Sequence, residues 1–366
     1  MKRKILLYSA VLCSFIAGAQ NYDNIAYPYL LFDGNARVAA MGQIASVSDT
    51  LYYNGTYQNP ALLSRRVKSL GINYSKTDYP KSVYIGSKKS YHSLLALFSI
   101  NTANAFSISY CSLNVDDKEI YFIHENEVFT TEVKDRRIDI LKLNYAHHFK
   151  NGLSFGSSIK YLYDWYSYDL AETQSFMFDL GINYDGHLWR SLKSKANYSI
   201  GTSLSNIGGK AKYKYVKLEE ERFLPANFSL GVALFPVFVI HNDFNLRLTI
   251  AHETNKLLLS DYASEEMLDD NISVIQSYFD SFNGDLEGLT HKFGIETNFQ
   301  LYQNYSIAFR YGNSHQKSTD SKITSFGFGI NFYNFYVNYY QLQNFEMNYD
   351  NTEVHFFDIG YAYIFK

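Results

Sequence analysis

The chain has 366 residues, of which 17% are aromatic, including 34 Tyr and 28 Phe, and its formal net charge is −3. This acidic balance, without a basic patch, excludes nucleic acid as an expected partner. The slightly negative mean hydropathy of −0.23 excludes a bundle of membrane-spanning helices, but not a membrane β-barrel, whose strands are only half apolar. The aromatic excess is typical of the girdles where a barrel crosses the two membrane interfaces.

A secretory signal peptide is predicted over residues 1–19. Three basic residues at positions 2–4 precede an apolar run, and Ala17-Gly18-Ala19 forms a cleavage motif. The run is too short to cross a bilayer as a helix, and no later stretch reaches about 18 apolar residues. Cleavage removes three of the 33 basic residues, which leaves 30 against 36 acidic ones and a net charge of −6. One cysteine, Cys111, remains, so no internal disulfide is expected.

Residues 20–66 do not alternate like strands, and we predict that they form a plug inside the barrel that the following strands build. The segment is rich in small residues, which permit close packing in a confined space, and it ends in the turn motif Asn59-Pro60-Ala61-Leu62. The plug residues that we single out are Arg37, Gly42, Asn59 and Pro60. A periplasmic arm is the alternative interpretation.

Residues 67–366 predict an all-β fold, a transmembrane outer-membrane barrel of about fourteen antiparallel strands. In residues 304–312 four large apolar residues alternate with Ser306, Ala308, Arg310 and Gly312, so each set lies on one face of a strand. Small residues with Arg310 and Asp358 suit a polar lumen behind a lipid-facing wall. The expected strands are 69–75, 82–100, 104–113, 137–148, 153–164, 173–187, 197–206, 226–235, 243–253, 289–300, 304–313, 322–332, 334–341 and 354–365.

The connections between these strands alternate in length, if the N-terminus is taken as periplasmic. The short ones are 102–103, 150–152, the stretch around Arg190, 236–242, 301–303 and 333. The others are mostly long: 114–136, 165–172, 207–225, 254–288, 314–321 and 342–353. Short periplasmic turns and long outer loops are the expected asymmetry of an outer-membrane barrel.

The long connections carry most of the charge and one predicted helix. The run Leu-Glu-Glu-Glu-Arg at 218–222 indicates a solvated loop. Within 275–282 four apolar residues fall at i, i+3, i+4 and i+7, which predicts a short helix. The sequence leaves open whether this apolar stripe packs on the barrel or binds a partner.

Catalytic, metal and cofactor sites are not predicted. His147 and His148 are adjacent, so on a strand they point to opposite faces and cannot chelate one metal. His252-Glu253 lacks the second histidine of an H-E-x-x-H zinc site. No spacing singles out a Ser-His-Asp set. We therefore expect a protein that is not an enzyme.

Several motifs resemble the PorV family of type IX secretion, within the FadL-like group of barrels. Residues 35–37, 41–42 and 59–61 follow the family's plug, although the aromatic that often precedes its Asn-Pro is Gln58 here. Later motifs are Ser205-Asn206-Ile207-Gly208-Gly209, the run 223–231, Asn255-Lys256-Leu257-Leu258 and the segment 273–282. The acidic, glycine-rich part of the long loop is reduced to residues 283–285. The PorQ relatives share the plug and stay an alternative.

This resemblance implies a non-enzymatic function in the outer membrane. Such a barrel binds the C-terminal signal domain of secreted cargo at the type IX translocon and delivers the cargo to a sortase-like surface attachment complex. Our candidates for cargo binding, in the connections 207–225 and 254–288, are Tyr213, Tyr215, Phe223, Phe279 and Phe282. Packing within the loops or the aromatic girdle is the alternative for each. The rival function is a FadL-type transporter of hydrophobic small molecules, which the small and polar inward residues of 229–233 and 245–249 disfavour.

Overall fold

The computed structural model describes residues 25–31, 34–47, 58–63, 69–79, 89–115, 118–124, 127–133, 136–166, 172–214, 219–241, 243–259, 273–282, 289–302, 304–316, 321–344 and 354–364. The predicted signal peptide lies outside these residues. None of the helices in the described part of the chain is long and apolar enough to span a membrane.

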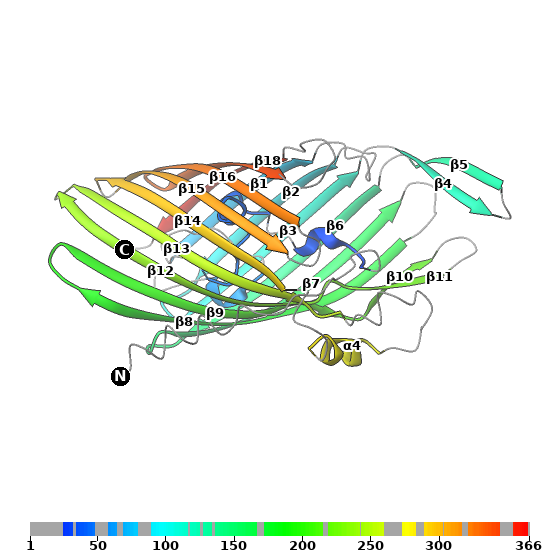
Figure 1. Ribbon diagram of the computed structural model, residues 1–366, viewed down its shortest axis with the longest axis horizontal. Coiled ribbons are helices and arrows are strands. Elements are labelled where there is room, and N and C mark those ends of the chain that lie inside the picture. Colours follow the sequence, from blue (N-terminus) through cyan, green and yellow to red (C-terminus); the bar gives the residue numbers. More distant parts are fainter. Residues whose placement is uncertain are drawn as a thin grey trace.

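Among the described residues, fourteen strands form one closed antiparallel barrel in which the last strand pairs with the first (Figure 1). Closure pairs the backbone groups of every strand, as a lipid environment requires. The predicted barrel class is therefore confirmed. The barrel strands are β1 (Ser69–Tyr79), β2 (Lys89–Ser99), β3 (Asn104–Val115), β6 (Arg136–His148), β7 (Leu153–Tyr166), β8 (Glu172–Arg190), β9 (Ser194–Gly208), β12 (Asn227–His241), β13 (Phe244–Leu257), β14 (Leu289–Leu301), β15 (Tyr305–Gln316), β16 (Ser321–Phe332), β17 (Phe335–Asn344) and β18 (Val354–Ile364).

The two ends of the barrel differ in their connections. At the short-turn end, strands are joined by tight turns such as 191–193 and 333–334. At the long-loop end, the connections include 116–135, 209–226 and 258–288. The long-loop end also carries helix α4 (Val274–Asp280), which matches the helix expected near 275–282.

The prediction that the long connections 114–136 and 207–225 lack strands was wrong. They contain two hairpins, β4–β5 (Lys118–His124, Glu127–Val133) and β10–β11 (Lys210–Lys214, Glu219–Phe223). The charged run 218–222 overlaps β11, which belongs to a two-stranded hairpin separate from the barrel wall and so has no lipid-facing side. The stretch 236–242 is also mostly strand, since β12 continues to His241, and β2 begins only at Lys89 with 82–88 outside the described residues.

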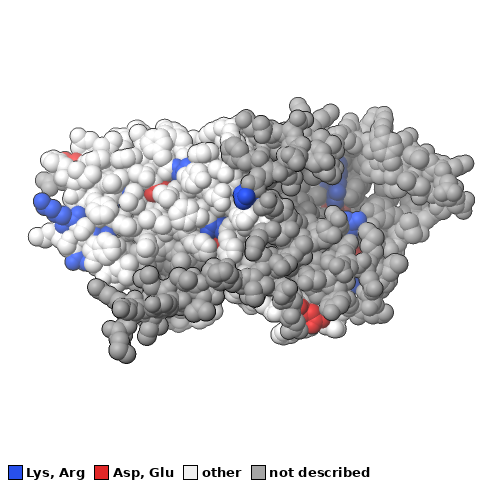
Figure 2. Space-filling model, viewed as in Figure 1, with Lys and Arg blue, Asp and Glu red and all other residues white. Residues whose placement is uncertain are grey.

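In the barrel wall the large apolar side chains face outward and the small and polar ones face the lumen, which is the reverse of a soluble protein. On β15 Ser306, Ala308 and Arg310 are buried on the lumen side, whereas Ile307 and Phe309 are exposed outward, as the alternation predicts. Where Figure 2 draws described residues, the outward wall carries few charged side chains. Lys and Arg side chains gather at the short-turn end of that view. This pattern fits an apolar band facing lipid, with charge at its border.

The N-terminal segment, residues 25–63 as far as they are described, runs through the lumen. It contains η1 (Pro28–Leu31), α2 (Ala36–Ala40) and η2 (Pro60–Leu62), with α2 against β15–β18 and η2 against β6–β8. Ile25 pairs with Phe223 at the long-loop end, and Leu63 packs on Ala105 and Ala146 at the short-turn end. The barrel begins at the short-turn end, as expected, but the first described residue, Ile25, lies at the opposite end.

Candidate functional site

Helix α2 can lie close against the lumen side of the wall because three of its five residues are alanine. The Asn35 side chain caps the helix by accepting hydrogen bonds from the backbone N–H of Arg37 (2.9 Å) and of Val38 (3.1 Å). A Cβ on Gly327 would lie 2.3 Å from the Cβ of Ala40, so wall and helix approach as closely as small residues allow. This close approach explains the run of small residues in the sequence.

Arg37 projects from α2 into a buried ion cluster. Its Nε and Nη2 donate to the two carboxylate oxygens of Glu296 on β14, each at 3.0 Å. The Nε of Arg310 on β15 donates to the same carboxylate, and all three residues are at least 95% buried. Two guanidinium groups thus share one carboxylate in a space from which water is largely excluded.

The cluster continues around the wall and returns to the backbone of α2. Arg310 donates through Nη1 to the Asn338 side chain (2.9 Å), and Asn338 donates to Asp358 on β18 (2.7 Å). The other oxygen of Asp358 accepts from the backbone N–H of Ala36 (2.9 Å). Asp358 supplies the second negative charge, so two arginines balance two carboxylates, and strands β14 to β18 all bind α2.

A second anchor holds the chain just after α2. Glu253 on β13 accepts hydrogen bonds from the backbone N–H of Ala45 (2.8 Å) and of Ser46 (2.6 Å), and from the Ser46 hydroxyl (2.6 Å). Lys292 on β14 pairs with Glu253 (3.0 Å) and donates to the Gln43 carbonyl (2.8 Å). Glu253 is fully buried, so the segment supplies donors that its carboxylate needs.

The remaining plug residues predicted from sequence fill backbone roles. Gly42 has φ of +74°, and a Cβ there would lie 2.9 Å from the Asn313 backbone, so only glycine fits easily. Asn59 caps η2 through the Ala61 N–H (3.0 Å) and donates to the Ser46 carbonyl (2.8 Å). Pro60 begins η2, where its missing N–H costs nothing.

A third charged cluster lies in the wall on the other side of the lumen. Asp179 on β8 pairs with Lys142 (2.9 Å) and Lys160 (2.8 Å). Lys160 also donates to the Asn206 side chain (2.6 Å), and the Asn206 amide donates to the Leu30 carbonyl in η1 (3.4 Å). This cluster connects the wall to the start of the N-terminal segment.

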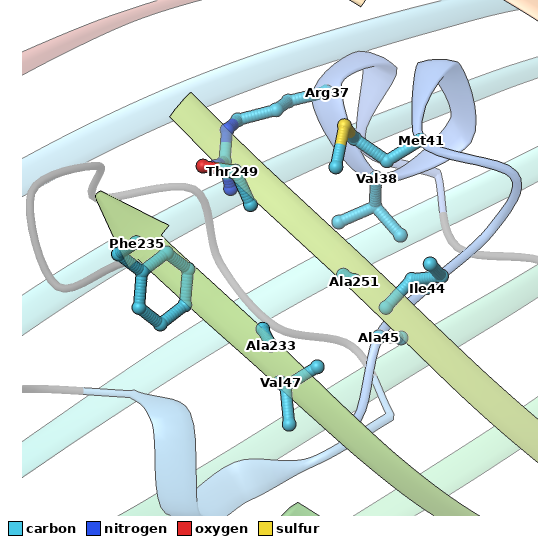
Figure 3. A pocket seen from close by; sticks show the side chains of 10 residues that line it. All are labelled: Arg37, Val38, Met41, Ile44, Ala45, Val47, Ala233, Phe235, Thr249 and Ala251. Atoms are coloured by element: carbon cyan, nitrogen blue, oxygen red, sulfur yellow. The ribbon is translucent and has the colours of Figure 1, made fainter. Parts of the chain in front are cut away.

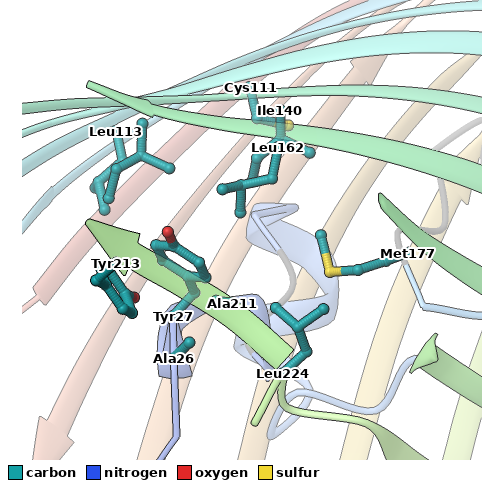
Figure 4. Close-up of a cluster of buried hydrophobic side chains, with 11 residues drawn as sticks. Ala26, Tyr27, Cys111, Leu113, Ile140, Leu162, Met177, Ala211, Tyr213 and Leu224 are labelled. Atoms are coloured by element: carbon teal, nitrogen blue, oxygen red, sulfur yellow. The ribbon is translucent and has the colours of Figure 1, made fainter. Parts of the chain in front are cut away.

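A cluster of buried apolar side chains lies in the lumen at the long-loop end (Figure 4). Tyr27 and Tyr213 lie with ring centroids 5.9 Å apart, among buried apolar residues that include Leu113, Leu162 and Leu224. Burial, and secondarily the negative charge of Asp164, raises the pKa of the Tyr27 hydroxyl far above its usual range. Tyr213 is only 6% exposed, so in this structure it packs against the N-terminal segment instead of facing outward.

The other predicted cargo-binding residues lie in separate places. Phe223, half-buried, is the residue of β11 whose carbonyl accepts a hydrogen bond from the Ala26 N–H (2.9 Å). Phe279 and Phe282 lie at α4 and are 71% and 51% exposed. Tyr215 lies outside the described residues. The four candidates that the structure describes therefore do not form one surface.

A small recess separates the N-terminal segment from β12 and β13 (Figure 3). Its volume of about 20 Å³ has room for about one water molecule, and its lining is apolar except for Arg37 and Thr249. Arg37 is already bound to Glu296, so its charge is not free for a ligand. No group of three or more His, Cys, Asp or Glu within the described residues could hold a metal ion.

Sequence reasoning missed the acidic partners of the N-terminal segment, above all Glu253 and Glu296. Both occupy the inward position of an alternating strand, as do Lys142, Lys160 and Lys292. Charged residues at lumen-facing positions were the available signal. Their spacing in the sequence does not say which of them would meet Arg37.

The sequence over residues 17–263 matches the family model described as type IX secretion system protein PorV. The chain belongs to the PorV family. With its closed fourteen-stranded barrel, this PorV-family protein is an outer-membrane barrel of type IX secretion, and its partners belong to that system. PorV is not a family of enzymes.

Other comparisons return distant similarity. No curated protein matches the sequence. Among solved structures, the CymD monoaromatic hydrocarbon channel is 10% identical, with a TM-score of 0.49 over 93% of this chain and 99% of that one. The Ralstonia pickettii toluene transporter TbuX is 11% identical, with a TM-score of 0.47 over 92% and 99%. A Pseudomonas aeruginosa FadL homologue is 10% identical, with a TM-score of 0.44 over 91% and 98%.

Proposed function

We propose that this barrel binds the C-terminal signal domain of secreted cargo at its long-loop end and carries the cargo from the type IX translocon to the surface attachment complex. The family match over residues 17–263 is the observation that carries this proposal. The arrangement of the long-loop end supports it, because hairpins β4–β5 and β10–β11 and helix α4 all lie there. The wall then serves as an anchor in the outer-membrane lipid.

Strand addition is the binding mode that the hairpins favour. Each hairpin is a separate two-stranded sheet among the described residues, and the edge of such a sheet is the kind of surface to which an extended strand can add. One edge of β11 already accepts a short parallel pairing from Ile25. An extended strand of the cargo domain would add to such an edge in the same way.

We also propose that the N-terminal segment acts as a plug that keeps the lumen closed. Arg37, Gly42, Asn59 and Pro60 support this role through the contacts described above. A barrel that carries folded protein on its outer loops needs no open lumen. The rival transporter would instead require this segment to move.

A deletion strain tests the proposal. Loss of the gene should leave proteins with the C-terminal signal inside the cell and deplete them from the surface, as measured by proteomics of surface and supernatant. If the gene deletion leaves the surface proteins unchanged, the proposal that this protein carries cargo to the surface is refuted.

Complementation with a shortened connection locates the binding region. Replacing 262–284 by a short Gly/Ser linker should leave the barrel folded, since each doubling of loop length costs only about 0.6 kcal/mol. We expect normal insertion, judged by heat-modified mobility on gels, but loss of cargo co-purification. The matched control shortens 345–353 at the same end and should retain cargo. If both variants bind cargo normally, the connection 262–284 is not part of the mechanism.

A further inference from the structure

Helix α4 carries its large apolar side chains on the side that faces away from the protein. Ile275, Phe279 and Phe282 are 68%, 71% and 51% exposed, and their spacing places them in one stripe. The small polar residues Ser277 and Ser281 are the buried ones. A helix on a water-facing surface instead buries its apolar side chains and exposes its polar ones. The lipid-facing barrel wall shows the same inversion as α4.

Two contacts fix α4 on the outer side of the barrel rim. The Tyr278 hydroxyl donates to the Gly208 carbonyl (2.9 Å) and accepts from the Gly208 N–H (3.2 Å) at the end of β9. The Phe282 ring lies 6.3 Å from the ring of Phe228 on β12. Asn227 and Ser229 are buried toward the lumen, so Phe228 between them faces outward. Figure 1 shows α4 outside the ring of strands.

The depth of α4 follows from the same strand. The next outward residues after Phe228 are Leu230 and Val232, which are exposed apolar residues of the wall. Two residues of strand span roughly 7 Å. Amphipathic helices at membrane surfaces bury their apolar side by about 5–10 Å at the border between headgroups and acyl chains. The stripe on α4 is therefore continuous with the lipid-facing wall at its border.

We propose that α4 is an interfacial anchor whose stripe of Ile275, Phe279 and Phe282 lies in the lipid leaflet at the long-loop end. Lipid is the occupant that continuity with the wall favours, because Phe282 packs on an outward residue of that wall. The anchor holds the connection 258–288 against the rim through Tyr278. It assigns Phe279 and Phe282 to lipid, so within the connection 258–288 cargo contact falls to residues outside this stripe.

Tryptophan fluorescence in nanodiscs tests this assignment. The two native tryptophans, Trp165 and Trp189, are replaced by phenylalanine, and Phe279→Trp is introduced as the reporter. Brominated phosphatidylcholine should quench this reporter strongly, most of all with bromines near the headgroup, whereas iodide in the buffer should quench it little. Phe328→Trp on the wall is the lipid-exposed reference. Gln276→Trp, on the same helix outside the stripe, is the matched control and should show the reverse preference.

Two results would overturn the proposal. Quenching of Phe279→Trp by iodide but not by brominated lipid places the stripe in water. Protection from iodide that appears only when a cargo signal domain is added makes a protein the occupant. Ile275→Trp gives an independent reading should Phe279→Trp fail to fold. The readout needs no cargo or secretion, so its failure is distinct from failure of the proposed shuttle function.

Discussion

Glu296→Ala should release the N-terminal segment from the wall more than Arg37→Ala does. In Arg37→Ala, Glu296 keeps Arg310 as a partner. In Glu296→Ala, two buried guanidinium groups lose the carboxylate between them. Removing one partner of a buried ion pair costs about 3–5 kcal/mol. We place Arg37→Ala near the lower bound and Glu296→Ala near the upper one.

Hydrogen exchange of peptides covering 36–47 measures this release directly. A loss of about 3 kcal/mol in local stability corresponds to roughly a hundredfold faster exchange, since each 1.4 kcal/mol is tenfold. Peptides from β6 and β7, on the other side of the lumen, should keep wild-type exchange. The exposed Arg190→Ala is the control for loss of a positive charge. The double variant should cost less than the sum of the two single ones, because the residues share one cluster.

The reasoning is refuted if exchange over 36–47 in Glu296→Ala matches that of the wild type. It is also refuted if Arg37→Ala proves the more damaging change, because the shared carboxylate would then not be the centre of the cluster. Loss of the whole barrel in both variants would show that the wall itself depends on the segment. Heat-modified mobility on gels separates that outcome from local release.

Two further predictions concern the wall and its orientation. Phe309→Arg, at an outward position in mid-strand, should cost about 2–4 kcal/mol near the bilayer midplane, whereas Ala308→Ser on the lumen side should be close to neutral. Equal heat resistance of the two variants in detergent would contradict the facing assignment. Tags inserted at Asn283 or Lys217 should bind antibody on intact cells and a tag at Asn151 should not, because long loops face outward. Equal labelling at all three sites would contradict this orientation.

The barrel was predictable from sequence because alternation is a local signal. Each barrel strand has one face toward lipid and one toward the lumen. Apolar and polar residues therefore alternate within a stretch of about ten residues. All fourteen barrel strands were located this way. The hairpins β4–β5 and β10–β11 were missed, because neither lies in the barrel wall with one face toward lipid. The charged residues of 218–222 therefore led to the prediction of a loop.

The partners of the N-terminal segment were not predictable, because they depend on tertiary register. Arg37 meets Glu296 across 259 positions of sequence, and Ser46 meets Glu253 across 207. Alternation shows that both glutamates face inward. It does not show which residues of the N-terminal segment lie beside them in the lumen. The positions of Tyr213 and Phe223 were not predictable for the same reason, since both residues contact residues 25–27, which are distant in the sequence.

The polar lumen therefore has a different meaning from the one that the sequence suggested. In the sequence, the small and polar inward residues of 229–233 and 245–249 argued against a hydrophobe transporter. In the structure Glu253, Glu296 and Asp358 bind the N-terminal segment, and the small wall residues make room for it. Lumen polarity is thus complementary to the protein's own chain and does not by itself decide between shuttle and transporter. The two functions differ in whether the N-terminal segment must leave the lumen. Glu296→Ala, which weakens its attachment, should leave cargo secretion unchanged if the lumen has no transport function.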